Sequence, residues 1–313
     1  MRGDRPQARG ITAPAPKRDN KIITIGTWNI RTLSPGIDSL DVRHGEIRQA
    51  KLVDQELTRL RADIVALQET RLAETGSIRE DNFTFFWRGL PANQPRHHGV
   101  GFAIRNTMLV LSTTPLDISE RLMSLSIHAN GGRVNLICAY APTLAASHEE
   151  KDAFYGQLNE TIESCPYKEQ TYILGDFNAR VGRDNLNWPS VLGHFGMGNL
   201  NSNGQRLLEL YAEKGLAVTN TYFSVKLHRR ASWRHPRSGQ WHQIDFILTK
   251  REYLKMCRVT RAYHSADCST DHSLFLSKIR LKLMERPRSS CRPKKKIKVA
   301  MTTGYKTHLA FLV

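Results

Sequence analysis

The sequence has no long apolar run. Nowhere in its 313 residues does a stretch approach the roughly 18 consecutive apolar side chains of a membrane-spanning helix. The first 20 residues, MRGDRPQARGITAPAPKRDN, also lack the apolar segment of a secretory signal. We therefore expect neither a membrane span nor a secretory leader.

Cysteine is scarce as well. The five cysteines are odd in number and form no CxxC pair, which is typical of a reduced, intracellular protein. Cys257, Cys268 and His264 match no zinc-ligand spacing, and soft sulfur ligands do not suit hard-metal phosphate chemistry. These residues, and the pair His97-His98, are therefore interpreted as structural.

Acidic side chains are outnumbered by basic ones, 29 to 46, which gives a formal net charge of +17. Much of this excess lies in residues 1–21 and 282–313, so it points only weakly to a polyanionic partner of the body. We expect a disordered basic leader over 1–20, one domain over 21–281, and a basic, disordered tail over 282–313.

The body contains one basic stretch, 226–237, in which cationic and aromatic side chains alternate. Such a mixture suits phosphate contact together with base stacking. The same pattern also fits a solvated loop with two structural tryptophans, and both interpretations stay open. The candidate nucleic-acid-binding residues are Arg229, Arg230, Trp233, Arg234 and Trp241.

Strand-like segments outnumber helix-like segments. Apolar spacing predicts helices over 46–61, 148–164 and 202–215, the last with Ser202 as N-cap and ending at Gly215. Residues 217–223 are among the predicted strands, and Gly131-Gly132 is a predicted hairpin turn. Many hairpin-linked strands with helices inserted singly favour an α/β fold of mixed sheets with helices outside.

Polar side chains stand where apolar segments stop or start. Taken singly, each has a plain explanation: an Asx-turn, a cap or a surface pair. Together, carboxylates, amides, a tyrosine and a histidine are the groups needed for metal-assisted hydrolysis of a phosphate ester. These residues are Asn29, Glu69, Tyr140, Asp176, Asn178, Asp245, Asp271 and His272.

Seven short motifs carry a family resemblance. The chain resembles the endonuclease/exonuclease/phosphatase superfamily over roughly 21–281, particularly the endonuclease domains of LINE-type (non-LTR) retrotransposons, and is similar to craniofacial development protein 2-like chains. The resemblance implies a DNase I-like four-layer α/β sandwich of two packed mixed β-sheets flanked by helices. The motifs, in chain order, are GTWNIRTL, LQETR, HHGVGFAIRN, LICAYAPT, ILGDFNARVG, WHQIDFIL and STDHSLF.

The resemblance also implies roles. Glu69 would be the principal ligand of Mg²⁺, for which Mn²⁺ could substitute, and Asn29 and Asp271 would line the same pocket. Asp176 would move the proton of the attacking water or of the leaving oxygen.

The remaining matched residues would act on the phosphate. Asn178 would hold the nucleophile or a phosphoryl oxygen, and Tyr140 would hydrogen-bond the phosphate. His272, oriented by Asp245, would contact the scissile phosphate.

Tyr140 bears on the substrate. Where secreted DNases and several phosphatases of the superfamily carry a histidine, this chain has a tyrosine, which resembles abasic-site and retrotransposon nucleases. We expect a nicking endonuclease acting on DNA, in duplex form, without a reverse transcriptase or a small-molecule cofactor. The alternatives are an abasic-site repair endonuclease, a catalytically weak domesticated nucleic-acid-binding protein and, last, an inositol-phosphate or sphingomyelin hydrolase.

A final motif concerns location. The tail segment RPKKKIKV resembles a nuclear-import signal, although a merely solvated basic tail fits equally well. We expect a nuclear protein, with the cytoplasm as the alternative.

Overall fold

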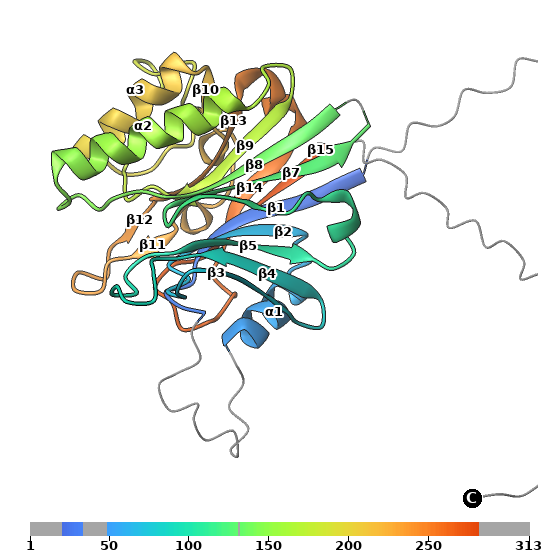
Figure 1. The fold of residues 1–313 in the computed structure, drawn as a ribbon. Helices are drawn as coiled ribbons and strands as arrows, with labels where there is room; N and C mark the ends of the chain where they lie inside the picture. The colour runs from blue at the N-terminus through green and yellow to red at the C-terminus, as the bar shows by residue number, and fades with distance from the viewer. Residues whose placement is uncertain (1–20, 34–48, 131, 282–313) are drawn as a thin grey trace, which may run out of the picture.

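The computed structural model describes residues 21–33, 49–130 and 132–281 (Figure 1). The predicted leader and tail lie outside the described residues, as does Gly131 of the predicted hairpin turn. Among the described helices, none is both long and apolar enough to cross a membrane.

Two mixed sheets form the body. The first has seven strands, in the order β14 (Cys257–Tyr263), β15 (Leu274–Leu281), β1 (Lys21–Asn29), β2 (Ile64–Gln68), β5 (Val100–Arg105), β4 (Phe83–Arg88) and β3 (Thr75–Arg79). The second has six strands, in the order β10 (Leu216–Val218), β13 (Asp245–Lys250), β9 (Gln170–Asp176), β8 (Gly132–Tyr140), β7 (Leu122–Ala129) and β6 (Leu116–Ser119).

Helices cover the outer faces of the sheets. Helix α1 (Gln49–Arg59) packs on the first sheet, whereas α2 (His148–Ser164) and α3 (Ser202–Glu213) pack on the second (Figure 1). A separate two-stranded hairpin joins β11 (Trp233–Arg234) to β12 (Trp241–His242). The short 3₁₀ helices are η1 (Leu109–Leu111), η2 (Thr219–Thr221), η3 (Leu227–Arg230) and η4 (Arg251–Met256).

Three apolar cores hold these layers together. The core between the sheets includes Phe102 of the first sheet and Leu136 of the second. Val53 of α1 packs in the core outside the first sheet, and Leu207 of α3 packs in the core outside the second. The order helix, sheet, sheet, helix confirms the predicted four-layer sandwich.

Each sheet contains one parallel pair, and these pairs position the site. β1 runs parallel to β2, and β8 runs parallel to β9, so all four strands end at the same edge of the sandwich. β13 and β15 are antiparallel to β9 and β1, so they begin at that edge. Polar residues that end one strand and open another are therefore brought together.

The predicted helices are confirmed with small corrections. Helix α2 spans the predicted residues and begins with a capping box at Ser147. Helix α3 is capped by Asn201 rather than Ser202, because the Asn201 side chain accepts a hydrogen bond from the Gly204 N–H. Residues 46–48 of the first predicted helix lie outside the described residues.

The strand predicted over 217–223 is wrong beyond Val218. Thr219 and Asn220 turn into η2 because their side chains bond the backbone of β13: Thr219 Oγ1 donates to Ile247 O at 2.7 Å, and Asn220 Oδ1 accepts from Ile247 N at 2.9 Å. The side-chain contacts therefore replace a strand ladder in this segment.

Asp54 of α1 ties the helix to the start of β4. Its carboxylate accepts hydrogen bonds from the backbone N–H groups of Asn82 and Phe83 and from the Asn82 amide, at 2.8–3.0 Å. Asp54→Ala leaves these donors without their acceptor, so we expect the free energy of unfolding to fall by about 2–4 kcal/mol. Urea denaturation checks this, with exposed Gln55→Ala on the same helix as the control; equal effects of the two substitutions would contradict the assignment.

Candidate active site

The strand ends meet at a cleft of about 590 Å³. Asn29 and Asp245 are fully buried, and both are hydrogen-bonded to cleft residues. The structure thus brings together all eight residues that the strand-end pattern indicated. Those that line the cleft are Glu69, Tyr140, Asp176, Asn178, Asp271 and His272.

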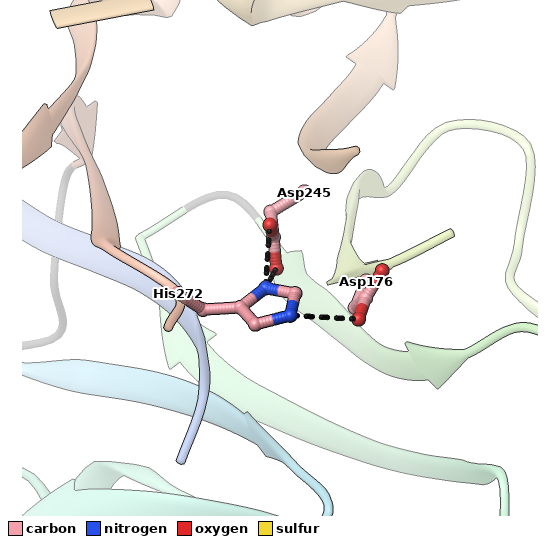
Figure 2. Close-up of side chains that lie close together, drawn as sticks. All are labelled: Asp176, Asp245 and His272. Atoms are coloured by element: carbon pink, nitrogen blue, oxygen red, sulfur yellow. Dashed lines mark hydrogen bonds and ion pairs between the residues drawn. The ribbon is translucent and has the colours of Figure 1, made fainter. Parts of the chain in front are cut away.

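An imidazole lies between two carboxylates (Figure 2). His272 Nδ1 is 3.0 Å from Asp245 Oδ2, and His272 Nε2 is 3.8 Å from Asp176 Oδ2. Asp176 and Asp245 are register partners on β9 and β13, and β13 and β15 bring Asp245 to His272. The first distance is a hydrogen bond and the second is an ion-pair contact.

Burial and mutual charge set the protonation of this group. Burial and the neighbouring Asp245 carboxylate raise the pKa of Asp176 to about 7, against the opposing effect of His272. Burial alone would lower the pKa of His272, but the Asp245 and Asp176 carboxylates outweigh it and raise the pKa to about 9. At neutral pH the imidazole is therefore a cationic donor, and Asp176 gains and loses its proton in the neutral range.

Glu69 follows β2 and is held by three donors. Its Oε1 accepts from Asn29 Nδ2 and from the Tyr140 hydroxyl, both at 2.9 Å. Its Oε2 accepts from Arg71 Nη2 at 2.6 Å. Burial, together with Glu69 and Asp176, raises the pKa of Tyr140, so its hydroxyl remains a donor throughout the neutral range.

Asp271 lies far from Glu69 in the amino-acid sequence but lines the same cleft. Its Oδ2 accepts from Trp233 Nε1 at 2.8 Å, and its Oδ1 is 3.8 Å from Arg31 Nε. The contact with Trp233 fixes the β11–β12 hairpin beside the site.

The turn after β9 combines a structural role with a functional one. The Asn178 N–H donates to Asp176 Oδ1 at 2.9 Å, which is the plain Asx-turn that the Asp-x-Asn spacing also predicts. Asn178 takes the left-handed conformation, with φ of 45°. Gly175 lies inside β9, before the turn, and the close approach of β8 requires glycine there because a Cβ would lie 2.1 Å from Ala139 O.

The five predicted nucleic-acid-binding residues are not all at the cleft. Trp233 lines it, while Arg234 and Trp241 line an adjoining hollow of about 800 Å³ that shares residues with the cleft. Arg229 lines a third, smaller hollow that shares His264 and Ser265 with the second, and Arg230 lies over the Phe195 ring and donates to Val225 O.

Sequence reasoning missed several basic residues of the cleft. Two of them, Arg31 and Arg71, stand two residues after Asn29 and Glu69, inside motifs that the sequence had already indicated. That spacing was the available signal, because a residue two positions beyond a strand-end ligand remains at the same edge. The missed lining residues are Arg31, Arg71, Arg180 and His242, whereas His235 belongs to the basic stretch 226–237 that the sequence indicated.

A brace between the sheets was also missed. Arg121 Nη2 is 3.2 Å from His98 Nε2, its Nη1 donates to Tyr140 O, and its guanidinium lies over the Tyr140 ring. Burial and the charge of Arg121 lower the pKa of His98. The Thr70 and Arg71 N–H groups donate to Gly99 O and His98 O, so this brace holds the Glu69 turn against Tyr140.

Two arrangements in the site could hold a cation. Among the described residues, Asp176, Asp245 and His272 form a group whose ligand atoms lie within 4.8 Å of one another. The carboxylates of Glu69 and Asp271, which line the same cleft, offer hard oxygen atoms of the kind that Mg²⁺ prefers, while Asn29 directs its Nδ2 to Glu69 and its Oδ1 to the Arg31 N–H. Because His272 Nδ1 is already hydrogen-bonded to Asp245, and because Mg²⁺ prefers oxygen ligands, the all-oxygen set suits this cation better.

Comparison with known proteins now decides the family. The model of the Endonuclease/Exonuclease/phosphatase family matches residues 26–272. The chain belongs to this family. It is also 30% identical to Bos taurus craniofacial development protein 2 over 270 residues, which cover 85% of this chain and 42% of that relative. The chain thus spans less than half the length of this curated family member.

Two solved structures share the fold. The catalytic domain of Xenopus laevis APE2 matches with a TM-score of 0.59 and 16% identity, over 84% of this chain and 94% of that one. The endonuclease domain of TRAS1, a telomere-specific non-LTR retrotransposon, matches with a TM-score of 0.55 and 13% identity, over 83% of this chain and 99% of that one. The resemblance inferred from the motifs is confirmed.

Proposed function

We propose that this chain is a Mg²⁺-dependent endonuclease that hydrolyses phosphodiester bonds of duplex DNA. The observation that carries the proposal is the meeting of Asp176, His272 and Glu69 at one cleft whose rim is basic. A buried proton acceptor, a cationic donor and an oxygen-ligand set side by side are what hydrolysis of a phosphodiester requires.

The donor set supports a divalent cation. Glu69 and Asp271 would hold it, with Asn29 fixing the Glu69 carboxylate, since Mg²⁺ typically takes one or two carboxylates and keeps several waters. When bound, the cation offsets negative charge on the phosphoryl group and favours ionisation of water. Mn²⁺, with similar oxygen preference, would substitute.

The chain's own residues would then divide the remaining work. Asp176 takes a proton from the attacking water as the new oxygen–phosphorus bond forms. His272 and the Tyr140 hydroxyl donate to phosphoryl oxygens while the bond to the leaving oxygen breaks, and the leaving oxygen takes up a proton from solvent water. Asp245 keeps His272 oriented and charged. Asn178 Nδ2 donates to Ala141 O, which fixes the carboxamide. Its Oδ1 then accepts a hydrogen bond from the attacking water and positions it.

The rim supports DNA as the substrate. Arg31, Arg71 and Arg180 line a cleft whose deeper part is acidic, so phosphates flanking the scissile bond meet cations while the scissile phosphate meets the acidic residues. Trp233 beside the cleft and Trp241, which is 41% exposed, offer stacking surfaces for bases. The names of the related nucleases favour the same substrate class, with an abasic site as the alternative lesion.

Nicking of supercoiled plasmid tests the proposal. We expect relaxed circles with Mg²⁺ or Mn²⁺, and complete loss of nicking with EDTA. The double variant Glu69→Gln/Asp176→Asn, purified identically, controls for contaminating nuclease. A wild-type protein that never nicks, or nicks no faster than the double variant, would make the chain a nucleic-acid-binding protein instead.

A second assay separates the candidate substrates. Labelled duplexes with and without one abasic site, and an inositol phosphate, are offered at equal concentration. We expect cleavage of intact duplex. Cleavage confined to the abasic duplex would instead assign a repair endonuclease, and phosphate release from the inositol phosphate alone would refute the nuclease assignment.

We also propose that the chain acts in the nucleus, directed by residues 286–299. A fluorescent protein fused to this segment is expected to move from the cytoplasm to the nucleus, because clustered lysines after proline suit import receptors. Changing Lys294, Lys295 and Lys296 to glutamine should abolish the redistribution. A fusion that stays cytoplasmic would contradict the proposal.

A further inference from the structure

Two arginines of the cleft form ion pairs with the two carboxylates proposed to hold the cation, Glu69 and Asp271. Arg71 Nη2 is 2.6 Å from Glu69 Oε2, and Arg31 Nε is 3.8 Å from Asp271 Oδ1. Both arginine side chains are well exposed, at 41% and 52%, and both line the cleft. Each candidate ligand carboxylate is therefore paired with an arginine of the chain itself.

The backbone holds these arginines in place. Arg31 and Arg71 have left-handed φ values of 59° and 51°, as does Glu69 at 54°. This conformation is uncommon for residues other than glycine and persists where the surroundings impose it. Here the Arg31 N–H donates to Asn29 Oδ1 at 3.1 Å, and the Arg71 N–H donates to His98 O at 3.0 Å.

Glu69 cannot keep all its partners when it also binds a cation. Its Oε1 already accepts from Asn29 and Tyr140, which are buried, and its Oε2 accepts from Arg71. Arg71 is the exposed partner on a long, flexible side chain, so it is the one that can leave. Its Nε is buried and has no hydrogen-bond acceptor within the described residues, so the guanidinium is incompletely satisfied in its present position.

We propose that Arg71, with Arg31 in a lesser role, exchanges between its carboxylate and a DNA phosphate, and so couples cation binding to DNA binding. A cation on Glu69 displaces the guanidinium, which then presents its planar fork to a phosphate beside the scissile bond. Without the cation, Glu69 neutralises Arg71 and repels the backbone. This inference rests on the proposed function and adds a mechanism for loading the substrate.

Reciprocity makes the proposal quantitative. If cation binding raises DNA affinity by some factor, DNA raises cation affinity by the same factor, and such couplings are typically about 5- to 150-fold. Removing the guanidinium should have effects of opposite sign on the two ligands. The protein should bind the cation more tightly in the absence of DNA, and bind DNA less tightly in the presence of the cation.

Binding measurements test this without relying on turnover. All proteins carry Asp176→Asn so that the duplex stays intact; Mn²⁺ affinity is measured by calorimetry and DNA affinity by fluorescence anisotropy with Mn²⁺ or with EDTA. In the parent we expect Mn²⁺ to raise DNA affinity about tenfold. With Arg71→Gln, we expect Mn²⁺ to bind several-fold more tightly and the DNA enhancement to shrink towards onefold.

Matched variants identify the cause. Arg258→Gln removes the same charge from an exposed position on β14 and should change neither affinity. Arg31→Gln should reproduce the Arg71 effects more weakly, because its pair is longer. The salt dependence gives an independent reading: with Mn²⁺ present, Arg71→Gln should lower the slope of log affinity against log salt by about one phosphate contact, and with EDTA it should not.

The alternatives give different results. If Arg71 only contacts phosphate, Arg71→Gln lowers DNA affinity equally with Mn²⁺ and EDTA and leaves Mn²⁺ affinity unchanged, which overturns the exchange. If it only supports Glu69, Mn²⁺ affinity falls, which also overturns it. Nicking by the wild type with either result leaves the proposed function standing. Failure of the parent to bind Mn²⁺, or equal binding by a Glu69→Gln variant, overturns both.

Discussion

Asp176→Asn is expected to slow plasmid nicking by about 10²–10⁴-fold, because it removes the group that takes the proton from water. The substitution keeps the shape of the side chain but only one of its two acceptor oxygens, so it can keep the hydrogen bond from Asn29 Nδ2 or the one from the Asn178 N–H, but not both. It removes the charge that burial and Asp245 have made basic, with the pKa raised to about 7. The loss should therefore appear in kcat rather than in KM.

The control for this variant is Asp117→Asn, which removes one carboxylate from an exposed position on edge strand β6. Its nicking rate should equal that of the wild type. DNA affinity of Asp176→Asn, measured with EDTA, should be unchanged or higher, since one negative charge has left the cleft. If Asp176→Asn nicks at more than about a tenth of the wild-type rate, another group accepts the proton and the assignment of Asp176 is wrong.

The sequence was sufficient for the parts of the site that follow from strand ends. Asn29, Glu69, Tyr140 and Asp176 each stand at the end of a strand, and parallel pairing brings such ends to one edge. Phe177, which separates Asp176 from Asn178, packs inward against Tyr211 and Phe246. A local pattern plus a simple rule of sheet geometry reached these positions.

Contacts that depend on backbone conformation could not be reached in this way. Nothing local indicates that Arg31 and Arg71 take left-handed φ values, and only that conformation brings their side chains to Asp271 and Glu69. Likewise, His98 and Arg121 lie on segments that belong to different sheets, so their contact requires the packed sandwich.

Edge strands show the same limit. The exposure of β3 (Thr75–Arg79) alternates between exposed and intermediate, without a buried face, so TGSIR gives no hydrophobic period to detect. The segment 219–221 shows the converse: strand-prone threonines form η2 because Asn220 finds two backbone partners on β13.

Asp245→Asn is expected to move the alkaline limb of the nicking rate to lower pH. Burial lowers the pKa of His272, and the Asp245 carboxylate is the largest of the effects that raise it to about 9. The wild-type rate should rise as Asp176 ionises and fall as His272 loses its proton. Asp176 and His272 interact strongly, so each limb of the pH profile belongs to the pair rather than to one residue. The alkaline limb is the informative one, because it reports the loss of the proton that Asp245 helps to hold. With the carboxamide, burial is opposed only by Asp176 and Asp271, so the limb should fall by about a unit or more and the rate above it by about tenfold or more.

Thermal unfolding gives a reading of the same pair that does not depend on activity. A histidine whose folded pKa is raised, here to about 9, stabilises the fold below its unfolded pKa of about 6.5, and this stabilisation is lost as pH rises through the folded value. The wild-type melting temperature should therefore fall more steeply between about pH 7 and pH 10 than that of Asp245→Asn, while Asp117→Asn should follow the wild type. If the melting temperatures of wild type and Asp245→Asn change equally with pH, Asp245 does not hold His272 in its charged form. His272 would then not be the cationic donor to the phosphate.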